Sequence, residues 1–404
     1  MRRIVIVGAG FAGVWSALSA ARLLSEQGDE GADIEIVVVA PRPSLDLRPR
    51  FYEPDVATMT TPLGPLFDAV GVRFVAGTVG AIEPDGSHVF ITDDSGRRAM
   101  LGYDRLILAA GSHLARPDLP GLAEHAFSID QRDEAAAFET HLQGLATRPA
   151  SAARNTVVVV GGGFTGVEIA MELPVRLRAI LGDDTPVRVV IIEQTAVIGP
   201  ELGEKPRPVI AEALASQGIE CRLATAVTRI DAGGVDITAG NRIETLSVLW
   251  TGGMRASGLT RCLPGERDAL GRLCVDRHLR VPGAPAVFAA GDTARAATDD
   301  EGHHTLMSCQ HAMVLGRFAG HNAAADLVGA PLLPYAQERY GTCLDLGPWG
   351  SIVTAGWDRA VQLAGPEAKA HKRFINGIAI MPPPPIRAEA LAAAAPLARS
   401  TARS

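Results

Sequence analysis

The sequence predicts an α/β fold built from two copies of one strand–turn–helix–strand unit. Residues 4–14 read IVIVGAGFAGV and residues 157–167 read VVVVGGGFTGV, so a shift of 153 positions aligns the three glycines of each copy. The strands that follow, IEIVVVA (34–40) and VRVVIIE (187–193), align without a gap. An apolar run that leads through G-x-G-x-x-G into a helical pattern is typical of Rossmann-like dinucleotide-binding domains. The first copy also resembles an export signal, but such a signal has no reason to recur in mid-chain.

Composition narrows the function classes. The chain has 404 residues, enough for two or three domains, and a net charge of −7 with a pI near 5.8, so no nucleic-acid partner is expected. Its five cysteines are scattered without a Cys-x-x-Cys pair, which excludes a zinc ribbon, gives no metal site and suits a reducing cytoplasm. No apolar run approaches the roughly 20 residues that span a bilayer, so any membrane contact would be peripheral.

The glycines of each turn have separate physical tasks. The first permits a tight bend, the second lets the backbone approach a pyrophosphate, and the third lets the helix pack on the strand. The helix N-terminus then offers free N–H groups to the anion. A glycine turn without a ligand is the alternative for each copy. The expected cofactor contacts are Gly8, Gly10, Phe11, Ala12 and Gly13 in the first turn, and Gly161, Gly163, Phe164, Thr165 and Gly166 in the second.

The two copies differ where their second strand ends. Glu193 ends the strand in the second copy, where a carboxylate can accept hydrogen bonds from both ribose hydroxyls and repel a 2′-phosphate. This predicts NADH rather than NADPH, unless Glu193 is only a solvated strand end. Ala40 occupies the same place in the first copy, so the ribose there must be held in another way.

Other segments favour a flavin in the first copy. YDRLILAAGS (103–112) ends in Ala110 and Gly111, and VFAAGDTA (287–294) ends in Gly291 and Asp292. Asp292 could accept a hydrogen bond from a ribityl hydroxyl or cap a helix. Because this segment lies far from the first glycine turn, the first domain is expected to be discontinuous.

Two further groups are candidates for flavin contacts. Arg48 could lie by the pyrophosphate or form a surface ion pair. Residues 307–327 predict a helix with Ser308 as its N-cap. Its positive end would stabilise a reduced flavin and bring Cys309 and Gln310 close to the ring, although Cys309 could instead be a small core residue.

Together these residues resemble the type II NADH dehydrogenase (NADH:quinone oxidoreductase) family of pyridine nucleotide-disulfide oxidoreductases. The resemblance covers roughly residues 1–330 and rests on the two glycine turns, RPRFYE, the AAGS turn, VLWTGGMRAS, FAAGDTA and MSCQHA. It implies that FAD binds at the first turn and Asp292, that NADH binds at the second turn and Glu193, and that Gly253 contacts a cofactor.

The same resemblance assigns two carboxylates to the redox site. In GVEIAMEL it places Glu168 near the nicotinamide and Glu172 near the flavin and quinone face. The two stand four residues apart on one helical face and could relay a proton, so Glu172 and Gln310 are the expected catalytic residues. A solvated helix stripe is the alternative for Glu172. Pro174 is expected to end or kink this helix.

The chain departs from the family pattern in ways that concern the acceptor. Leu315 replaces a second glutamine near the quinone, and the cysteine pair of the disulfide reductases is missing. Electrons would then pass directly from FAD to an acceptor, most simply a quinone. The alternatives are reduction of a ferredoxin-like protein, or an NADH-binding flavoprotein with a sensing or biosynthetic role.

The predicted domain organisation follows from these placements. Residues 1–115 and 251–330 form the FAD-binding domain, 116–250 the NADH-binding domain, 331–385 a small α+β acceptor or interface region, and 386–404 a flexible tail. KRFINGIAIM (372–381) joins basic to apolar residues and could touch a membrane surface. The protein is expected in the cytoplasm or peripherally on the inner face of the membrane, and the C-terminal region could also form a homodimer contact.

Overall fold

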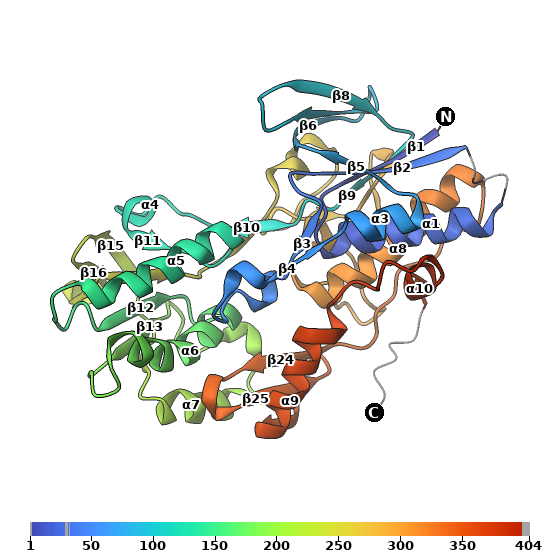
Figure 1. Ribbon diagram of the computed structural model, residues 1–404. Coiled ribbons are helices and arrows are strands. Elements are labelled where there is room, and N and C mark those ends of the chain that lie inside the picture. The colour runs from blue at the N-terminus through green and yellow to red at the C-terminus, as the bar shows by residue number, and fades with distance from the viewer. Residues whose placement is uncertain (1, 29–30, 32, 398–404) are drawn as a thin grey trace.

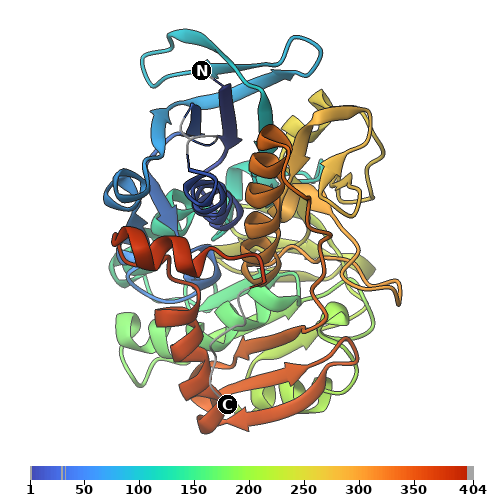
Figure 2. The same cartoon turned by 90° about the vertical axis from the view of Figure 1, so that its right-hand side faces the viewer.

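The computed structural model describes residues 2–28, 31 and 33–397, which form two lobes (Figure 1). Each lobe is centred on its own mainly parallel sheet, so the predicted α/β fold with two Rossmann-like units is confirmed. The C-terminal segment, red in the side view, runs along both lobes (Figure 2).

The first sheet has six strands in the order β21-β22-β9-β1-β2-β5. All neighbours are parallel except the β21–β22 pair. The strands are β1 (Arg2–Val7), β2 (Ile34–Ala40), β5 (Arg73–Ala76), β9 (Arg105–Leu108), β21 (Arg280–Val281) and β22 (Ala284–Ala289).

Alternating side chains cover the two faces of this sheet. Ile4 and Ile6 pack with two helices, whereas Val5 and Val7 pack with an antiparallel sheet on the other face. Both faces are therefore buried, as an apolar parallel strand requires. The helices are α1 (Phe11–Glu26) and α8 (Cys309–Val328), and the antiparallel strands are β6 (Thr78–Glu83), β7 (His88–Thr92) and β8 (Arg98–Gly102).

Helices α1 and α8 cross at close range. A Cβ on Gly316 or Gly320 of α8 would collide with the backbone oxygen of Ala12 or Ser16 of α1. Small residues on α8 therefore bring its N-terminus beside the first glycine turn.

The second sheet repeats this plan with the order β11-β18-β12-β13-β14. Helix α6 follows its glycine turn as α1 follows the first one. The strands are β11 (Ala126–Phe127), β12 (Thr156–Val160), β13 (Arg188–Ile192), β14 (Glu220–Arg222) and β18 (Ser247–Trp250), and the helices are α5 (Arg132–Gly144), α6 (Phe164–Leu181) and α7 (Arg207–Ser216). A further antiparallel sheet consists of β15 (Val227–Asp231), β16 (Gly234–Ile237) and β17 (Arg242–Glu244).

Two chain crossings connect the lobes. The strands of the second sheet fall between β9 and β21 in sequence, and β10 (Ser112–Leu114) pairs with β19 (Met254–Ala256) where the chain leaves and re-enters the first lobe. The remaining short elements are β3 (Ser44–Asp46), β4 (Thr60–Pro62), α3 (Gly64–Val70), α4 (Leu122–His125), β20 (Leu273–Cys274) and β23 (Ala294–Arg295).

The C-terminal region adds a small antiparallel sheet and a helix beside α6. The sheet consists of β24 (Gly341–Asp345), β25 (Ser351–Ala355) and β26 (Ala360–Gly365), and the helix is α9 (Pro366–Phe374). Short π-helical backbone at Ile375–Ala379 follows.

The structure corrects two expectations about helices. Helix α6 does not end at Pro174 but continues to Leu181, with the neighbouring Leu173 and Leu177 fully buried, so of the two expected effects only a kink remains a prediction. Part of the expected flexible tail forms α10 (Arg387–Ala393), which packs on α1 and α3 with Ala390 fully buried. Residues 398–404 of that tail lie outside the described residues.

Candidate functional site

One cavity of about 2650 Å³ opens between the lobes and contacts the carboxyl ends of both parallel sheets. A pocket for one small ligand usually measures about 300–1,000 Å³. The cavity therefore has room for more than one ligand.

Most of the predicted site residues line this cavity. They are Gly8, Gly10, Phe11, Ala12, Arg48, Ala110, Gly111, Gly161, Gly163, Phe164, Thr165, Glu168, Glu193, Gly253, Gly291, Asp292, Cys309 and Gln310. Gly13 and Gly166 lie behind the turns, where a Cβ would collide with the backbone oxygen of Gly8 or Gly161. These two glycines permit helix packing rather than ligand contact.

The first glycine turn leaves space for a ligand beside its backbone. Gly8 has a φ of 110°, and a Cβ there would collide with Ala109, whereas a Cβ on Gly10 would meet nothing within 4 Å. Open space over the second glycine, next to the N-terminus of α1, fits a pyrophosphate.

Polar groups from distant segments meet beside this turn. The Ser112 hydroxyl donates to Asp292 Oδ2 at 2.6 Å, and Arg48 Nη1 lies 3.9 Å from the same oxygen. Burial raises the pKa of Asp292. Arg48 also pairs with Asp130. Asp292 therefore lines the cavity and does not cap a helix. The ion pairs of Arg48 are partly buried and do not lie on the surface.

The N-terminus of α8 reaches the cavity as the sequence predicts. Ser308 is its N-cap and accepts a hydrogen bond from the His311 N–H. Burial raises the pKa of the Cys309 thiol to about 11, so the thiol is neutral at pH 7. Gln310 Oε1 is buried and has no hydrogen-bond partner among the described residues. An unpartnered amide oxygen in a residue of the cavity wall fits a polar cofactor such as a flavin.

Leu315 lies elsewhere. It is fully buried in the core that includes residues of α1 and α8, and it does not line the cavity. Its replacement of a family glutamine therefore changes core packing rather than the cavity wall.

The second glycine turn is occupied by carboxylates of the chain itself. Glu193 accepts hydrogen bonds from the Gly162 and Thr195 N–H groups, both at 2.8 Å, and is 7% exposed. Glu201 Oε1 accepts from the Phe164 N–H at 2.9 Å, at the start of α6. The sequence alone gives no sign of this role for Glu201, because nothing in GPELG marks its contact with a turn 37 residues away.

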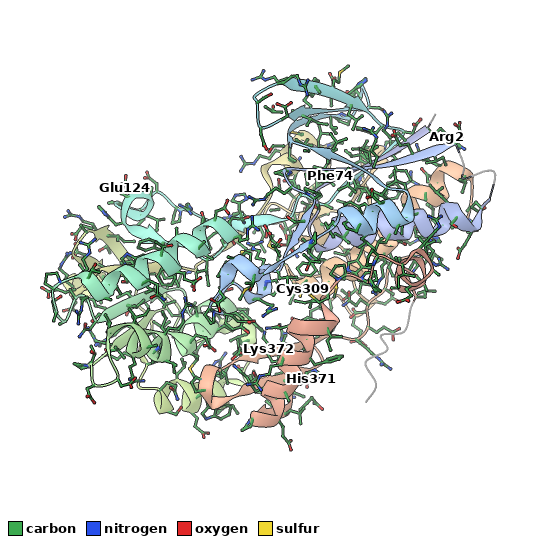
Figure 3. All side chains as sticks on the ribbon, in the orientation of Figure 1. Arg2, Phe74, Glu124, Cys309, His371 and Lys372 are labelled. Atoms are coloured by element: carbon green, nitrogen blue, oxygen red, sulfur yellow. The ribbon has the colours of Figure 1, made fainter. Side chains whose placement is uncertain are left out.

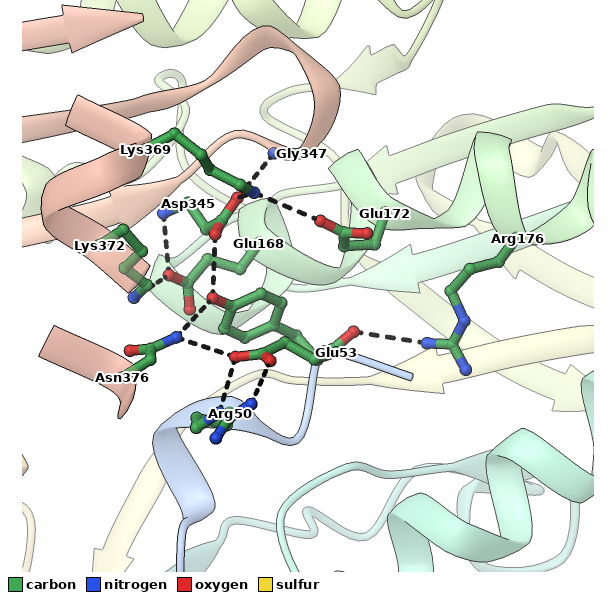
Figure 4. Close-up of polar contacts among 11 residues, drawn as sticks. Arg50, Glu53, Glu168, Glu172, Arg176, Asp345, Gly347, Lys369, Lys372 and Asn376 are labelled. Atoms are coloured by element: carbon green, nitrogen blue, oxygen red, sulfur yellow. Dashed lines mark hydrogen bonds and ion pairs between the residues drawn. The ribbon is translucent and has the colours of Figure 1, made fainter. Parts of the chain in front are cut away.

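A buried acid–base pair lies on the cavity wall near the centre of the molecule (Figures 3 and 4). Lys372 Nζ of α9 donates to Glu168 Oε1 of α6 at 2.8 Å, and the Asp345 N–H donates to the same oxygen at 2.9 Å. Burial raises the pKa of Glu168 to about 7, although Lys372 opposes the shift. Burial works against the charge of Lys372, but Glu168 outweighs it and the Lys372 pKa is raised.

A wider polar network surrounds this pair (Figure 4). The Tyr52 hydroxyl donates to Asp345 Oδ2 at 3.1 Å, and Asn376 Nδ2 donates to Glu53 Oε1 at 2.8 Å. Lys369 pairs with Asp345. The network joins the RPRFYE segment of the first lobe to α6 of the second lobe and to the C-terminal region.

The structure bears on two further predictions. Glu172 is not among the residues that line the cavity: it lies one turn further along α6, with its Oε1 3.7 Å from Lys369 Nζ. Burial raises the pKa of Glu172, and its catalytic role stays a prediction. Lys372, the first residue of the segment that could touch a membrane surface, is 5% exposed and turns inward to Glu168. Of the two glutamates on the helix, Glu168 is the one at the cavity.

Comparisons with known proteins agree with this architecture. A family profile described as "Pyridine nucleotide-disulphide oxidoreductase" matches residues 2–316. An NADH dehydrogenase-like protein of Mycobacterium tuberculosis is 47% identical over 399 residues, 98% of each chain. The demethylphylloquinone reductase of Synechocystis is 31% identical over 92% of this chain and 91% of that protein.

Solved structures share this fold. NDH2 from Plasmodium falciparum, in a complex with NADH, matches with a TM-score of 0.76 and 14% identity over 94% of this chain and 95% of that chain. The family match confirms the expectation of an oxidoreductase that uses FAD and NADH. The family match, the near full-length relatives and the two glycine turns that meet at one cavity lead to the same assignment. The chain belongs to the pyridine nucleotide-disulphide oxidoreductase family, as a type II NADH dehydrogenase-like member.

Proposed function

We propose that this NADH oxidoreductase passes electrons from NADH through bound FAD to a quinone. The proposal rests on one cavity that connects both glycine turns with the Glu168–Lys372 pair. The turn at residues 8–13 is called the first cradle, and the turn at residues 161–166 the second cradle. Two nucleotides and an acceptor can meet within one such space.

FAD is assigned to the first cradle. The open space at Gly10, the unpartnered Gln310 amide and the Asp292 carboxylate support this assignment. Residues 1–115 and 251–330 would then form the FAD-binding domain, and residues 116–250 the NADH-binding domain. Bound there, FAD would accept the hydride of NADH and deliver two electrons to the acceptor.

NADH is assigned to the second cradle. The buried Glu193 is held by two backbone N–H groups, which fix its carboxylate at the end of β13. A fixed carboxylate can accept hydrogen bonds from the adenosine ribose, and it disfavours a 2′-phosphate.

Glu168 is assigned the proton chemistry. The reaction NADH + H⁺ + quinone → NAD⁺ + quinol takes one proton from the solvent. With a pKa of about 7, Glu168 can take up and release that proton near neutral pH. Lys372 orients the carboxylate and stabilises its ionised form. Glu168 is therefore the proposed catalytic carboxylate at the cavity wall, with Glu172 one turn further along α6 and Gln310 at the flavin side.

A similar quinone oxidoreductase and the free cysteines support a quinone as the acceptor. The type II NADH:quinone oxidoreductase Ndh of Mycobacterium tuberculosis is 29% identical over 90% of this chain and 80% of that protein. All five cysteines are free thiols, so no disulfide stands between FAD and the acceptor.

A lipid-soluble quinone calls for access from a membrane. No helix in the described part of the chain is long and apolar enough to cross one. Four large apolar residues between 374 and 397 are nevertheless exposed: Phe374 (41%), Ile378 (64%), Ile386 (52%) and Leu397 (73%). We propose that this edge docks on the inner face of the cytoplasmic membrane. Wild-type protein should sediment with anionic vesicles, and Ile378→Glu should not.

An assay of acceptors tests the proposal. Purified holoenzyme should oxidise NADH rapidly with a soluble naphthoquinone, and slowly with a ferredoxin-like protein or with oxygen alone. Preference for the protein acceptor would replace the quinone by a ferredoxin-like partner. A reduced flavin that persists with every acceptor would favour the sensing role.

A further inference from the structure

The two glycine cradles differ in what lies over their second glycine. A Cβ on Gly10 would meet nothing within 4 Å, but a Cβ on Gly163 would collide with Glu201 Oε1. The same oxygen accepts a hydrogen bond from the Phe164 N–H at 2.9 Å. A carboxylate of the chain thus lies where the second cradle offers its backbone to a pyrophosphate.

The backbone of Glu201 is fixed, while its side chain is exposed. Gly199 N donates to Gly162 O at 2.9 Å, which ties the start of the turn to the cradle. Arg359 Nη2 of the C-terminal region donates to the Glu201 carbonyl at 3.2 Å, and the next residue, Leu202, is 4% exposed. Displacement of the carboxylate therefore needs only a rotation of the Glu201 side chain.

A pyrophosphate cannot share this position with a carboxylate. Both are anions, and both need the N–H groups at the start of α6. Glu193 already adds a second carboxylate beside Gly162. The Glu201 carboxylate would repel the pyrophosphate but not the adenosine portion of the dinucleotide, which would bind at the end of β13.

We propose that Glu201 is an internal competitor for the dinucleotide pyrophosphate and sets the affinity of the second cradle. The inference rests on the proposed function, which assigns NADH to that cradle. NADH binds by displacing the Glu201 side chain from the Phe164 N–H, and the side chain returns when the product leaves.

Calorimetric titration of holoenzyme with ADP-ribose tests this inference without reducing the flavin. ADP-ribose keeps the pyrophosphate and lacks the nicotinamide. Glu201→Ala should tighten its binding about 3- to 10-fold, the order expected for removing one anion from a helix N-terminus. Glu201→Gln, which keeps an acceptor oxygen without the charge, should give a smaller gain.

Two controls isolate the pyrophosphate. Glu204→Ala removes a charge from the same loop without touching the cradle and should leave the ADP-ribose affinity unchanged. Adenosine, which has no phosphate, should bind the wild type and Glu201→Ala equally. Unchanged or weaker ADP-ribose binding by Glu201→Ala would overturn the inference alone. Absence of ADP-ribose binding in the wild type and in all variants would overturn the NADH assignment as well.

Discussion

Lys372 Nζ and Glu168 Oε1 lie 2.8 Å apart, although 204 residues separate them in sequence. Both residues are buried, at 5% and 4% exposure, so each supplies the main charge partner of the other at the cavity wall. The pair links the C-terminal region to α6 and places a carboxylate with a raised pKa at the cavity.

Lys372→Met tests how much the pair stabilises the fold. Removing one partner of a buried ion pair costs about 3–5 kcal/mol when the other charge stays behind, and less if Glu168 becomes protonated. Denaturant unfolding measures the loss. Lys205→Met is the control, because its pair with Asp358 is exposed to solvent and should contribute little to stability. Equal losses of unfolding free energy in the two variants would contradict a stabilising role for the Lys372–Glu168 pair.

The raised pKa of Glu168 predicts a pH dependence of stability. Folding raises this pKa from 4.5 to about 7, so the folded protein binds the proton more tightly than the unfolded chain. The corresponding stabilisation is complete below about pH 4.5 and is lost as the pH rises through about 7.

Unfolding free energies between pH 5 and pH 8 measure this slope. The double variant Glu168→Gln/Lys372→Met is neutral at both positions and should lack the decline seen in the wild type. An unchanged slope in the double variant would show that other groups cause it.

Gly10→Ala separates folding from flavin binding. The fold has room for the methyl group, but that group would lie where FAD approaches the backbone. The variant should unfold at nearly the wild-type denaturant concentration while its flavin content falls. Gly64→Ala also has open space around the added methyl group and should keep its flavin. Full flavin content in Gly10→Ala would count against the first cradle.

Glu193→Ala should raise the KM for NADH and leave FAD bound. Loss of hydrogen bonds to a charged group costs about 1.5–3 kcal/mol, which corresponds to a rise of roughly 10- to 100-fold. Steady-state kinetics and flavin absorbance measure the two effects. Glu212→Ala, an exposed residue of α7, serves as the control. Loss of flavin instead would reverse the assignment of the two cradles.

The sequence predicted the parts of the site that depend on local signals. Both glycine turns, Asp292 and the Ser308 N-cap follow from short motifs, and the carboxyl ends of parallel strands necessarily meet at one edge of a sheet. The 153-residue repeat also predicted two sheets of the same plan.

The parts that depend on distant contacts could not be predicted. Lys372 begins a segment that joins basic to apolar residues, which suggested a membrane surface, and only the packing of α9 on the second lobe turns it toward Glu168. Glu201 lies in a short 3₁₀ helix, Pro200–Leu202, whose carbonyl at Glu201 accepts a hydrogen bond from Arg359, far away in sequence. The alanine-rich segment at 387–393 forms a helix because α1 and α3 offer it an apolar surface.

We propose that FAD in the shared cavity takes electrons from NADH and gives them to a quinone. Anaerobic rapid mixing tests this transfer: NADH-reduced holoenzyme is mixed with a soluble naphthoquinone while the flavin absorbance is followed. The flavin band should return within the time of one turnover, and much faster than on mixing with air-saturated buffer. A flavin that stays reduced in the presence of the quinone would contradict the proposed electron transfer.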